Sequence, residues 1–324
     1  MKRLLTLLLC TAMLLGLCAG CGGKTKRYTA VDYAFDTEIS LIAYSKNQVE
    51  FDGLKDTLFG EMHRLHRLFD IYTESSDGLY AANAGAGQAV AVAPEVTELL
   101  QFGKQAYELT EGRVNIAMGS VLRLWKTARD TGVLPVNEEL QNAMQHCRID
   151  DLMLEGNTVT LLDPQMSVDV GAIAKGWAAQ KAAEKADSAG YTDYVLSAGG
   201  NIVARGTAGD RAWMVGIRDP DPTSSTGVIT TVEASDMALV TSGGYERNLT
   251  VNGKTYCHII DPETGYPADY VISATAICPD SGLADAFSTA LFLMEPENAL
   301  AFAEKQGIRV ILVDAENHVI DSAN

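Results

Sequence analysis

The clearest structural signal in this chain is the run Asn248-Leu249-Thr250-Val251-Asn252-Gly253-Lys254-Thr255-Tyr256-Cys257. The Asn-Gly pair at its centre favours a tight turn, so the residues on either side are predicted to pair as a β-hairpin. Further hairpins are predicted around Gly156-Asn157 and in residues 308–321. Because a hairpin places antiparallel strands side by side, we expect antiparallel or mixed sheets.

Long stretches of helical periodicity separate these strands. An amphipathic helix is predicted near 49–69, where leucines recur at helical spacing. Other helices are expected over 94–112, 117–131, 137–147, 172–189, 281–294 (capped by Ser281) and 297–306, with a loop over 73–90. Runs of strands between long helices predict an α+β fold of sheets packed with helices rather than a doubly wound α/β fold. No Pro- or Ser-rich linker is visible, so a single compact unit is expected.

The N-terminus has the pattern of an export signal. Lys2 and Arg3 precede an apolar run that is too short to favour a membrane-spanning helix, which predicts a signal peptide over 1–20. The residues Leu17-Cys18-Ala19-Gly20-Cys21 resemble a bacterial lipobox, which implies that Cys21 becomes the lipid-bearing first residue. Residues 21–27 would then be a tether and 28–324 the folded domain, anchored on the outer side of the cell membrane. An uncleaved anchor is the alternative, and it also places the rest of the chain outside the cytoplasm.

The composition limits the partners. The formal net charge is −17, and removal of the two basic residues of the signal would make it more negative. This acidity argues against nucleic acid and anionic membrane surfaces as partners. A phosphate-bearing ligand would find few free cations, so a bound divalent metal is expected with it. The other cysteines have no metal-ligand spacing and are expected to be small buried thiols: Cys147, Cys257 and Cys278.

A histidine stands directly after the first hairpin, in the octet His258-Ile259-Ile260-Asp261-Pro262-Glu263-Thr264-Gly265. An imidazole beside a turn can titrate near neutral pH and reach a bound ligand. Asp261 could orient the imidazole, but Asp-Pro followed by Thr-Gly is typical of a turn, and we favour that role.

Two other segments suggest binding chemistry. In the run Val168–Trp177 a short strand is expected to end at glycine and a helix to begin at once, which suits an anionic ligand. Asp169 could accept hydrogen bonds from a polar ring or ribose, and Lys175 could pair with phosphate. Glycine pairs in Ser197–Asn201 and Thr241–Tyr245 would let the backbone approach a ligand. On spacing alone, a helix start with Asp169 as its cap and Lys175 in solvent is slightly favoured for the first segment, and plain hairpin turns still explain both glycine pairs.

Asp285 and Thr289 lie four residues apart on a predicted helix, so they share one face. A carboxylate and a hydroxyl are hard oxygen ligands suited to Mg²⁺. A buried hydrogen bond between the two side chains is the simpler interpretation, and spacing alone favours it.

Taken in order, these segments resemble the ApbE family of flavin transferases, over about Phe35 to Leu293. The resemblance rests on Phe35-Asp36-Thr37, Gly112-Arg113-Val114-Asn115 with Leu124-Trp125, Asp169–Gly176, Ser197–Asn201, Trp213–Pro220, Thr241–Glu246, the histidine octet and Ala284–Ala290. It implies a T-fold-related α+β unit. It also implies binding of FAD and Mg²⁺, cleavage of the pyrophosphate, transfer of FMN through its phosphate to a threonine or serine of another protein, and release of AMP.

The resemblance also implies roles for individual residues. His258 would take the proton of the incoming hydroxyl. The metal site would use the Ala172 carbonyl, Asp285 and Thr289, with Ser288 nearby. The FAD site would be lined by Phe35, Tyr72, Arg113, Val114, Asn115, Asp169, Lys175 and Ile259. The chain departs from the family where Phe35-Asp36-Thr37 replaces the usual Met-Gly-Thr and where Asn115 replaces a frequent Asp.

Three functions compete at this stage. The first is FMN transfer to an exported acceptor with a short Ser/Thr flavinylation motif, often part of a membrane electron-transfer complex. The second is hydrolysis of FAD to FMN and AMP, with water in place of the hydroxyl. The third is a flavin-binding lipoprotein without catalysis, which would not need a base such as His258.

Overall fold

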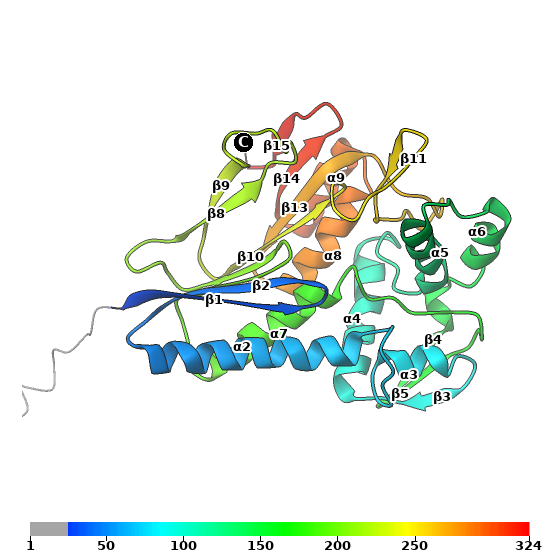
Figure 1. Ribbon diagram of the computed structural model, residues 1–324, viewed down its shortest axis with the longest axis horizontal. Coiled ribbons are helices and arrows are strands. Elements are labelled where there is room, and N and C mark those ends of the chain that lie inside the picture. The colour runs from blue at the N-terminus through cyan, green and yellow to red at the C-terminus, as the bar shows by residue number, and fades with distance from the viewer. Residues whose placement is uncertain (1–24, 324) are drawn as a thin grey trace, which may run out of the picture.

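The computed structural model describes residues 25–323. Its centre is an eight-stranded sheet in the order β1-β2-β6-β7-β10-β13-β14-β15 (Figure 1). Every neighbouring pair in it is antiparallel, as the hairpins predicted. The strands are β1 (Lys26–Ala34), β2 (Thr37–Ser45), β6 (Tyr194–Ala198), β7 (Asn201–Arg205), β10 (Met237–Gly243), β13 (Val271–Cys278), β14 (Arg309–Asp314) and β15 (Val319–Asp321).

The two faces of the sheet pack against different partners because successive side chains point to opposite faces. In β10, Ala238 and Val240 join the main core, whereas Leu239 faces the other way. The main core lies under three helices that contact the sheet, α2 (Gln48–Phe69), α7 (Ala174–Ser188) and α8 (Ser281–Phe292). Helix α7 packs against both α2 and α8, and α9 (Pro296–Gln306) packs against β14. The opposite face is covered by the hairpin of β8 (Trp213–Arg218) and β9 (Val228–Ala234). In β8, buried residues alternate strictly with exposed ones.

The remaining elements lie beside α2 and the sheet, on the right of Figure 1. They include α3 (Leu79–Ala84), α4 (Pro94–Leu109) and a small sheet of β3 (Ala89–Ala91), β5 (Thr158–Leu161) and β4 (Leu152–Glu155). A short 3₁₀ turn, η1 (Ile149–Asp151), directly precedes β4. A separate apolar cluster joins α5 (Gly119–Thr131) and α6 (Asn137–Met144) to the hairpin of β11 (Leu249–Val251) and β12 (Lys254–Tyr256). Through Ile260, this cluster also holds the histidine octet in place.

Several expectations about local structure were wrong. Residues 73–90 are not a loop, since they contain α3 and the start of β3. The N-cap of α8 is Asp280, whose side chain accepts a hydrogen bond from the Leu283 N–H at 2.8 Å, and Ser281 is buried. Residues 241–243 belong to β10 rather than to a glycine loop.

Differences also occur at element ends. The run after Val168 is irregular up to Ala174, where α7 begins, so no strand leads directly into the helix. Helix α4 ends at Leu109, ahead of Gly112. Strand β1 begins at Lys26, inside the expected tether, while the signal sequence and Cys21 lie outside the described residues. Within residues 25–323, the helices are too short or too polar to span a bilayer.

Helices α7 and α8 approach closely at Gly176. A Cβ built on Gly176 would lie 2.2 Å from the Ser281 carbonyl oxygen and 2.4 Å from the Asp285 Cβ, so only glycine fits. We expect Gly176→Ala to lower the free energy of unfolding by about 1–3 kcal/mol, because a rigid backbone contact cannot give way. Thermal unfolding measures this effect.

Gly60 in α2 provides the matched control. A Cβ there meets no atom within 4 Å, so Gly60→Ala should stabilise the protein by about 0.5–1 kcal/mol through helix propensity alone. A Gly176→Ala protein as stable as the wild type would show that the helices do not need this close approach.

Candidate active site

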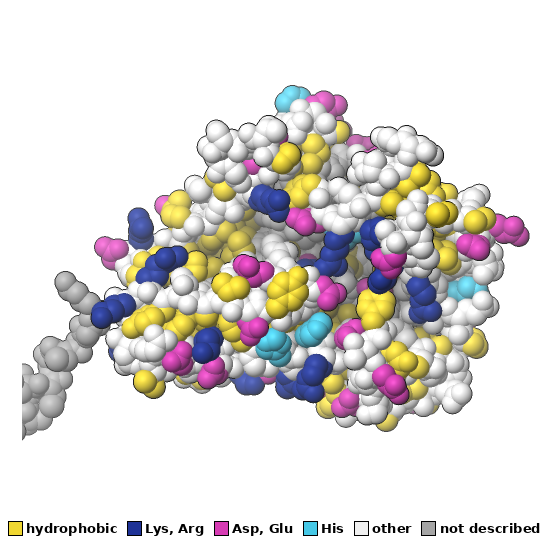
Figure 2. Space-filling model, in the orientation of Figure 1, with side chains coloured by type: hydrophobic (Ala, Val, Ile, Leu, Met, Phe, Trp, Pro, Cys, Tyr) yellow, Lys and Arg dark blue, Asp and Glu magenta, His cyan; other side chains and the backbone are white. Residues whose placement is uncertain are grey.

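One cavity of about 690 Å³ collects nearly all the residues expected to act. It opens where the β1–β2 turn, the end of α2, the start of α7, β10 and α8 meet, and Figure 2 shows basic side chains around a hollow on this face. The lining includes Phe35, Tyr72, Arg113, Val114, Asn115, Asp169, Ala172, Lys175, His258, Ile259, Asp285 and Thr289. Ser288 is fully buried behind the wall.

Asp285 is held on both sides of its carboxylate. It is 3% exposed, and Oδ2 accepts a hydrogen bond from the Gly176 N–H at 2.8 Å. Its Oδ1 lies 3.8 Å from the Lys175 Nζ. Burial raises the pKa of Asp285, and the Lys175 ammonium opposes this rise. The close approach at Gly176 therefore fixes a charged oxygen donor at the cavity wall.

Other oxygen donors lie around this carboxylate. The hydroxyl of Thr289 is 3.4 Å from the Ser242 Oγ. Ser288 donates to the Asp285 carbonyl oxygen at 2.9 Å and contacts the Ser242 Oγ at 2.8 Å, so it supports the helix rather than facing the cavity. Asp285 and Thr289 share one side of α8 as predicted, but no direct hydrogen bond joins their side chains in the described part of the chain, which removes the simpler interpretation.

The Ala172 carbonyl completes the donor set. The Gly176 N–H is one of the first-turn donors that have no acceptor within the helix, and it donates to Asp285. Within residues 25–323, no hydrogen-bond donor contacts the Ala172 oxygen. A carboxylate, a hydroxyl and a free carbonyl on one cavity fit the hard-oxygen preference of Mg²⁺.

His258 lies on the same cavity with one ring nitrogen engaged. Its Nδ1 is 3.2 Å from the Glu246 carbonyl oxygen, which can only accept, so Nδ1 carries the proton and Nε2 keeps its lone pair. Burial lowers the pKa of His258 to about 4, and the positive charge of Arg247 adds to this effect. The imidazole is therefore neutral near pH 7 and can accept a proton.

Asp261 does not contact this imidazole. Its Oδ1 accepts a hydrogen bond from the Glu263 N–H at 2.8 Å, and its carbonyl accepts one from the Gly265 N–H at 2.8 Å. These bonds confirm the turn role that the sequence favoured.

The turn between β6 and β7 brings another polar group to the cavity. Gly199 and Gly200 both have positive φ, and a Cβ on Gly199 would lie 2.4 Å from the Thr37 Oγ1. The glycine pair thus serves both a hairpin turn and a close approach. Asn201 follows it and is 1% exposed, with no hydrogen-bond partner for Nδ2 among the described residues. Its side-chain amide lies close enough to the Asp285 carboxylate to lower the pKa of that group.

The side of the cavity implied for the flavin is built from irregular backbone. Phe35 has φ of 55°, donates its N–H to the His66 Nδ1 at 3.2 Å and packs edge-on against that ring. Asp169 accepts a hydrogen bond from the Gly171 N–H at 2.8 Å, and burial raises the pKa of its carboxyl. Tyr72 is 60% exposed at the rim. These side chains offer an aromatic and polar wall to a planar ring.

Asn115 has a local structural role in this wall. Its Nδ2 donates to the Cys147 carbonyl at 2.9 Å, and its Oδ1 accepts from the Ala117 N–H at 2.9 Å. An aspartate could not make the first of these bonds, which gives a physical reason for the departure from the family pattern.

Five basic residues line the cavity, and the sequence analysis did not predict that they would lie together. They are Arg113, Arg129, Lys175, Arg218 and Arg247. Three of the five, Arg113, Lys175 and Arg218, pair with acidic side chains, so few free cations remain, as the composition suggested, although the cavity concentrates positive charge locally. Arg129 could have been suspected, because it lies four residues after the buried Trp125 on the same helix face.

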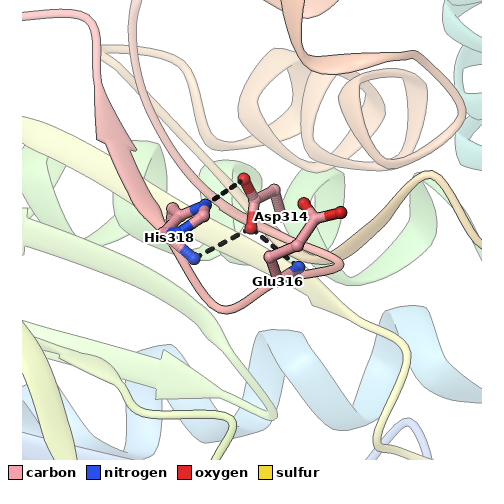
Figure 3. A group of neighbouring side chains, drawn as sticks. All are labelled: Asp314, Glu316 and His318. Carbon is pink, nitrogen blue, oxygen red and sulfur yellow. Dashed lines mark hydrogen bonds and ion pairs between the residues drawn. The ribbon is translucent and has the colours of Figure 1, made fainter.

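A cluster of metal-binding residue types outside the cavity has a simpler explanation. Asp314, Glu316 and His318 converge in the turn between β14 and β15 (Figure 3). Asp314 accepts hydrogen bonds from the backbone N–H groups of Glu316 and His318 at 2.9 and 2.8 Å, and its Oδ2 lies 3.1 Å from the His318 Nδ1. The group is an Asp-centred turn.

Several known proteins are similar to this chain in sequence. A family model described as "ApbE family" matches residues 35–312. The FAD:protein FMN transferase of Treponema pallidum is 31% identical over 94% of this chain and 89% of its own length. That of Rhodobacter capsulatus is 31% identical over 86% of this chain, which spans only about half (54%) of the longer relative.

The fold is shared as well. The crystal structure of the ApbE protein from Thermotoga maritima superposes with a TM-score of 0.82 and 27% identity, covering 92% of this chain and 97% of that one. It shares the α+β architecture that the sequence predicted. The match of the family model over most of residues 25–323, together with these likenesses, leaves one conclusion: this chain belongs to the ApbE family.

Proposed function

We propose that this protein is an Mg²⁺-dependent FAD:protein FMN transferase that joins FMN through its phosphate to a threonine or serine of an exported acceptor. The observation that carries the proposal is the meeting, on one cavity, of a neutral imidazole and a set of hard oxygen donors. Two relatives of similar sequence bear the name of this activity. The cavity volume also lies in the range of small-molecule sites.

The reaction follows from the groups at the site. The acceptor hydroxyl oxygen forms a bond to the phosphorus of the FMN half of FAD, and the bond from that phosphorus to the bridging oxygen breaks. The hydroxyl proton passes to the His258 Nε2, and AMP leaves with the bridging oxygen. General-base assistance of this kind typically contributes about 10²–10⁴-fold.

Ala172, Asp285 and Thr289 would hold Mg²⁺, which supplies positive charge to the phosphates when bound. Lys175 adds a second positive charge beside Asp285. The buried Asn201 amide, which acts on the Asp285 carboxylate, would help to hold that ligand in place.

We also propose the cellular setting. The signal over 1–20, lipidation at Cys21 and a domain from 28 to 324 would place the enzyme outside the cytoplasm on a membrane. Only four residues separate Cys21 from the start of β1 at Lys26, so a lipid anchor would keep the domain close to the bilayer. An acceptor in a membrane electron-transfer complex would be within its reach.

Incubation with FAD, Mg²⁺ and a candidate acceptor domain, followed by intact-mass measurement, tests the proposal. We expect the acceptor to gain one FMN phosphoester while AMP accumulates in equal amount. AMP and free FMN without an adduct would identify an FAD hydrolase instead. Bound FAD that is never cleaved would identify a binding protein.

A further inference from the structure

Two of the cavity cations differ from the others in having no carboxylate partner. Arg113, Lys175 and Arg218 each lie within 4 Å of an acidic side chain. Arg129 and Arg247 form no such ion pair within residues 25–323, although both line the cavity. The one hydrogen bond of the Arg247 guanidinium in that range runs from Nη2 to the Asp36 carbonyl oxygen, at 3.4 Å.

The two arginines line the same cavity but come from different parts of the fold. Arg129 projects from α5 and is partly buried, whereas Arg247 follows β10 and is exposed. Burial lowers the pKa of Arg129, and the positive charge of Arg247 lowers it further. The nearby groups that oppose this are Tyr72, Asp130 and Asp169.

The partly buried Arg129 guanidinium is unfavourable without a partner, since its desolvation is not offset, whereas the exposed Arg247 stays hydrated and adds positive charge beside it. Asp169 also lines the cavity, but its carboxylate is hydrogen-bonded to the Gly171 N–H and forms no ion pair with either arginine. The missing partner is therefore an anion from outside the protein.

We propose that Arg129 and Arg247 form a subsite for the phosphate oxygens of the nucleotide, separate from the oxygen donors around Asp285. The proposal rests on the function proposed above. Both arginines and Lys175 line the same cavity as His258, and their positive charges lower the pKa of its imidazole, so these charges act on the region where the reacting phosphate would lie. Guanidinium groups bind phosphate through two parallel hydrogen bonds, which a single ammonium cannot do.

This subsite predicts nucleotide binding without a metal. Calorimetry with metal-free protein in EDTA would compare FAD and ADP, which carry a pyrophosphate, with riboflavin, which carries none. We expect Arg129→Gln and Arg247→Gln each to weaken FAD and ADP binding by about 10- to 100-fold, as removal of a charge-assisted hydrogen bond does. Riboflavin affinity should not change.

Arg148→Gln is the matched control. Its side chain is 70% exposed and lies outside the cavity lining, so the same change of charge should leave all three affinities unaltered. Arg247→Gln, at an exposed position, keeps the test valid if Arg129→Gln fails to fold. Arg129→Lys should recover only part of the lost affinity.

Three results would overturn the subsite. The first is an FAD affinity that is unchanged in both variants. The second is a loss of riboflavin affinity as large as the loss of FAD affinity, which would assign the arginines to the flavin ring. Unchanged FAD affinity with a raised KM for the acceptor would assign them to a carboxylate of that protein. A wild type that binds no FAD under any condition would instead contradict the proposed function.

Discussion

Asp285→Asn should lower the rate of FMN transfer by about 10²–10³-fold at saturating FAD, the scale seen when one charge-stabilising group is removed from an active site. The amide keeps the shape of the carboxylate and can still accept the Gly176 hydrogen bond, now 2.8 Å long. It loses the negative charge that lies beside Lys175 and that a bound metal would need. AMP release measured against Mg²⁺ concentration gives the effect.

Asp280→Asn is the control on the same helix. Asp280 is the N-cap of α8, and asparagine caps a helix about as well as aspartate, so this variant should keep its activity and its melting temperature. Wild-type activity of Asp285→Asn at limiting Mg²⁺ would contradict the metal assignment. The melting temperature of Asp285→Asn separates a loss of chemistry from a loss of fold.

His258→Gln should slow transfer by about 10²–10⁴-fold and leave FAD affinity nearly unchanged, because the side chain is assigned to the proton and not to binding. Single-turnover rates with bound FAD, together with separate affinity measurements, distinguish the two effects. His318→Gln, in the distant β14–β15 turn, is the control. If affinity collapses while the turnover of bound FAD persists, His258 is a ligand contact.

The same residue sets the pH dependence. Only neutral imidazole can take a proton, and the pKa of His258 is lowered to about 4 in the free protein. The value of kcat/KM should therefore stay level as pH falls from 8 to about 5.5 and should decline only as pH approaches 4. An ordinary histidine would cause the decline near pH 6.5. A decline centred there would show that the imidazole is not buried in the way described.

The sequence analysis predicted correctly those elements whose conformation depends on residues near them in the chain. Asn252 and Gly253 both have positive φ, as their turn requires, and the helix expected near 49–69 is present as α2. The sequence predicted Asp285 and Thr289 for the same reason, since helical spacing alone puts them on one side of α8.

Elements fixed by distant partners were missed. The glycines after Ser242 suggested a turn, but residues 241–243 lie in the middle of the sheet and pair with β13, while the preceding part of β10 also pairs with β7. Pairing across the sheet overrides local preference there. The arginines facing the cavity were missed because net charge is a sum over the whole surface, and it does not report which side chains share one hollow.

The order of strands has a consequence for how the protein reaches its folded state. Strand β2 (Thr37–Ser45) pairs with β6 (Tyr194–Ala198), which lies about 150 residues later in the chain, so this pairing forms only after a long loop has closed. Cavity residues then come from positions as far apart as Phe35 and Leu293. Folds dominated by such distant pairings form slowly, because long loops must close before any contact stabilises them. The binding site should therefore be among the last features to form, and refolding followed by fluorescence should be slow.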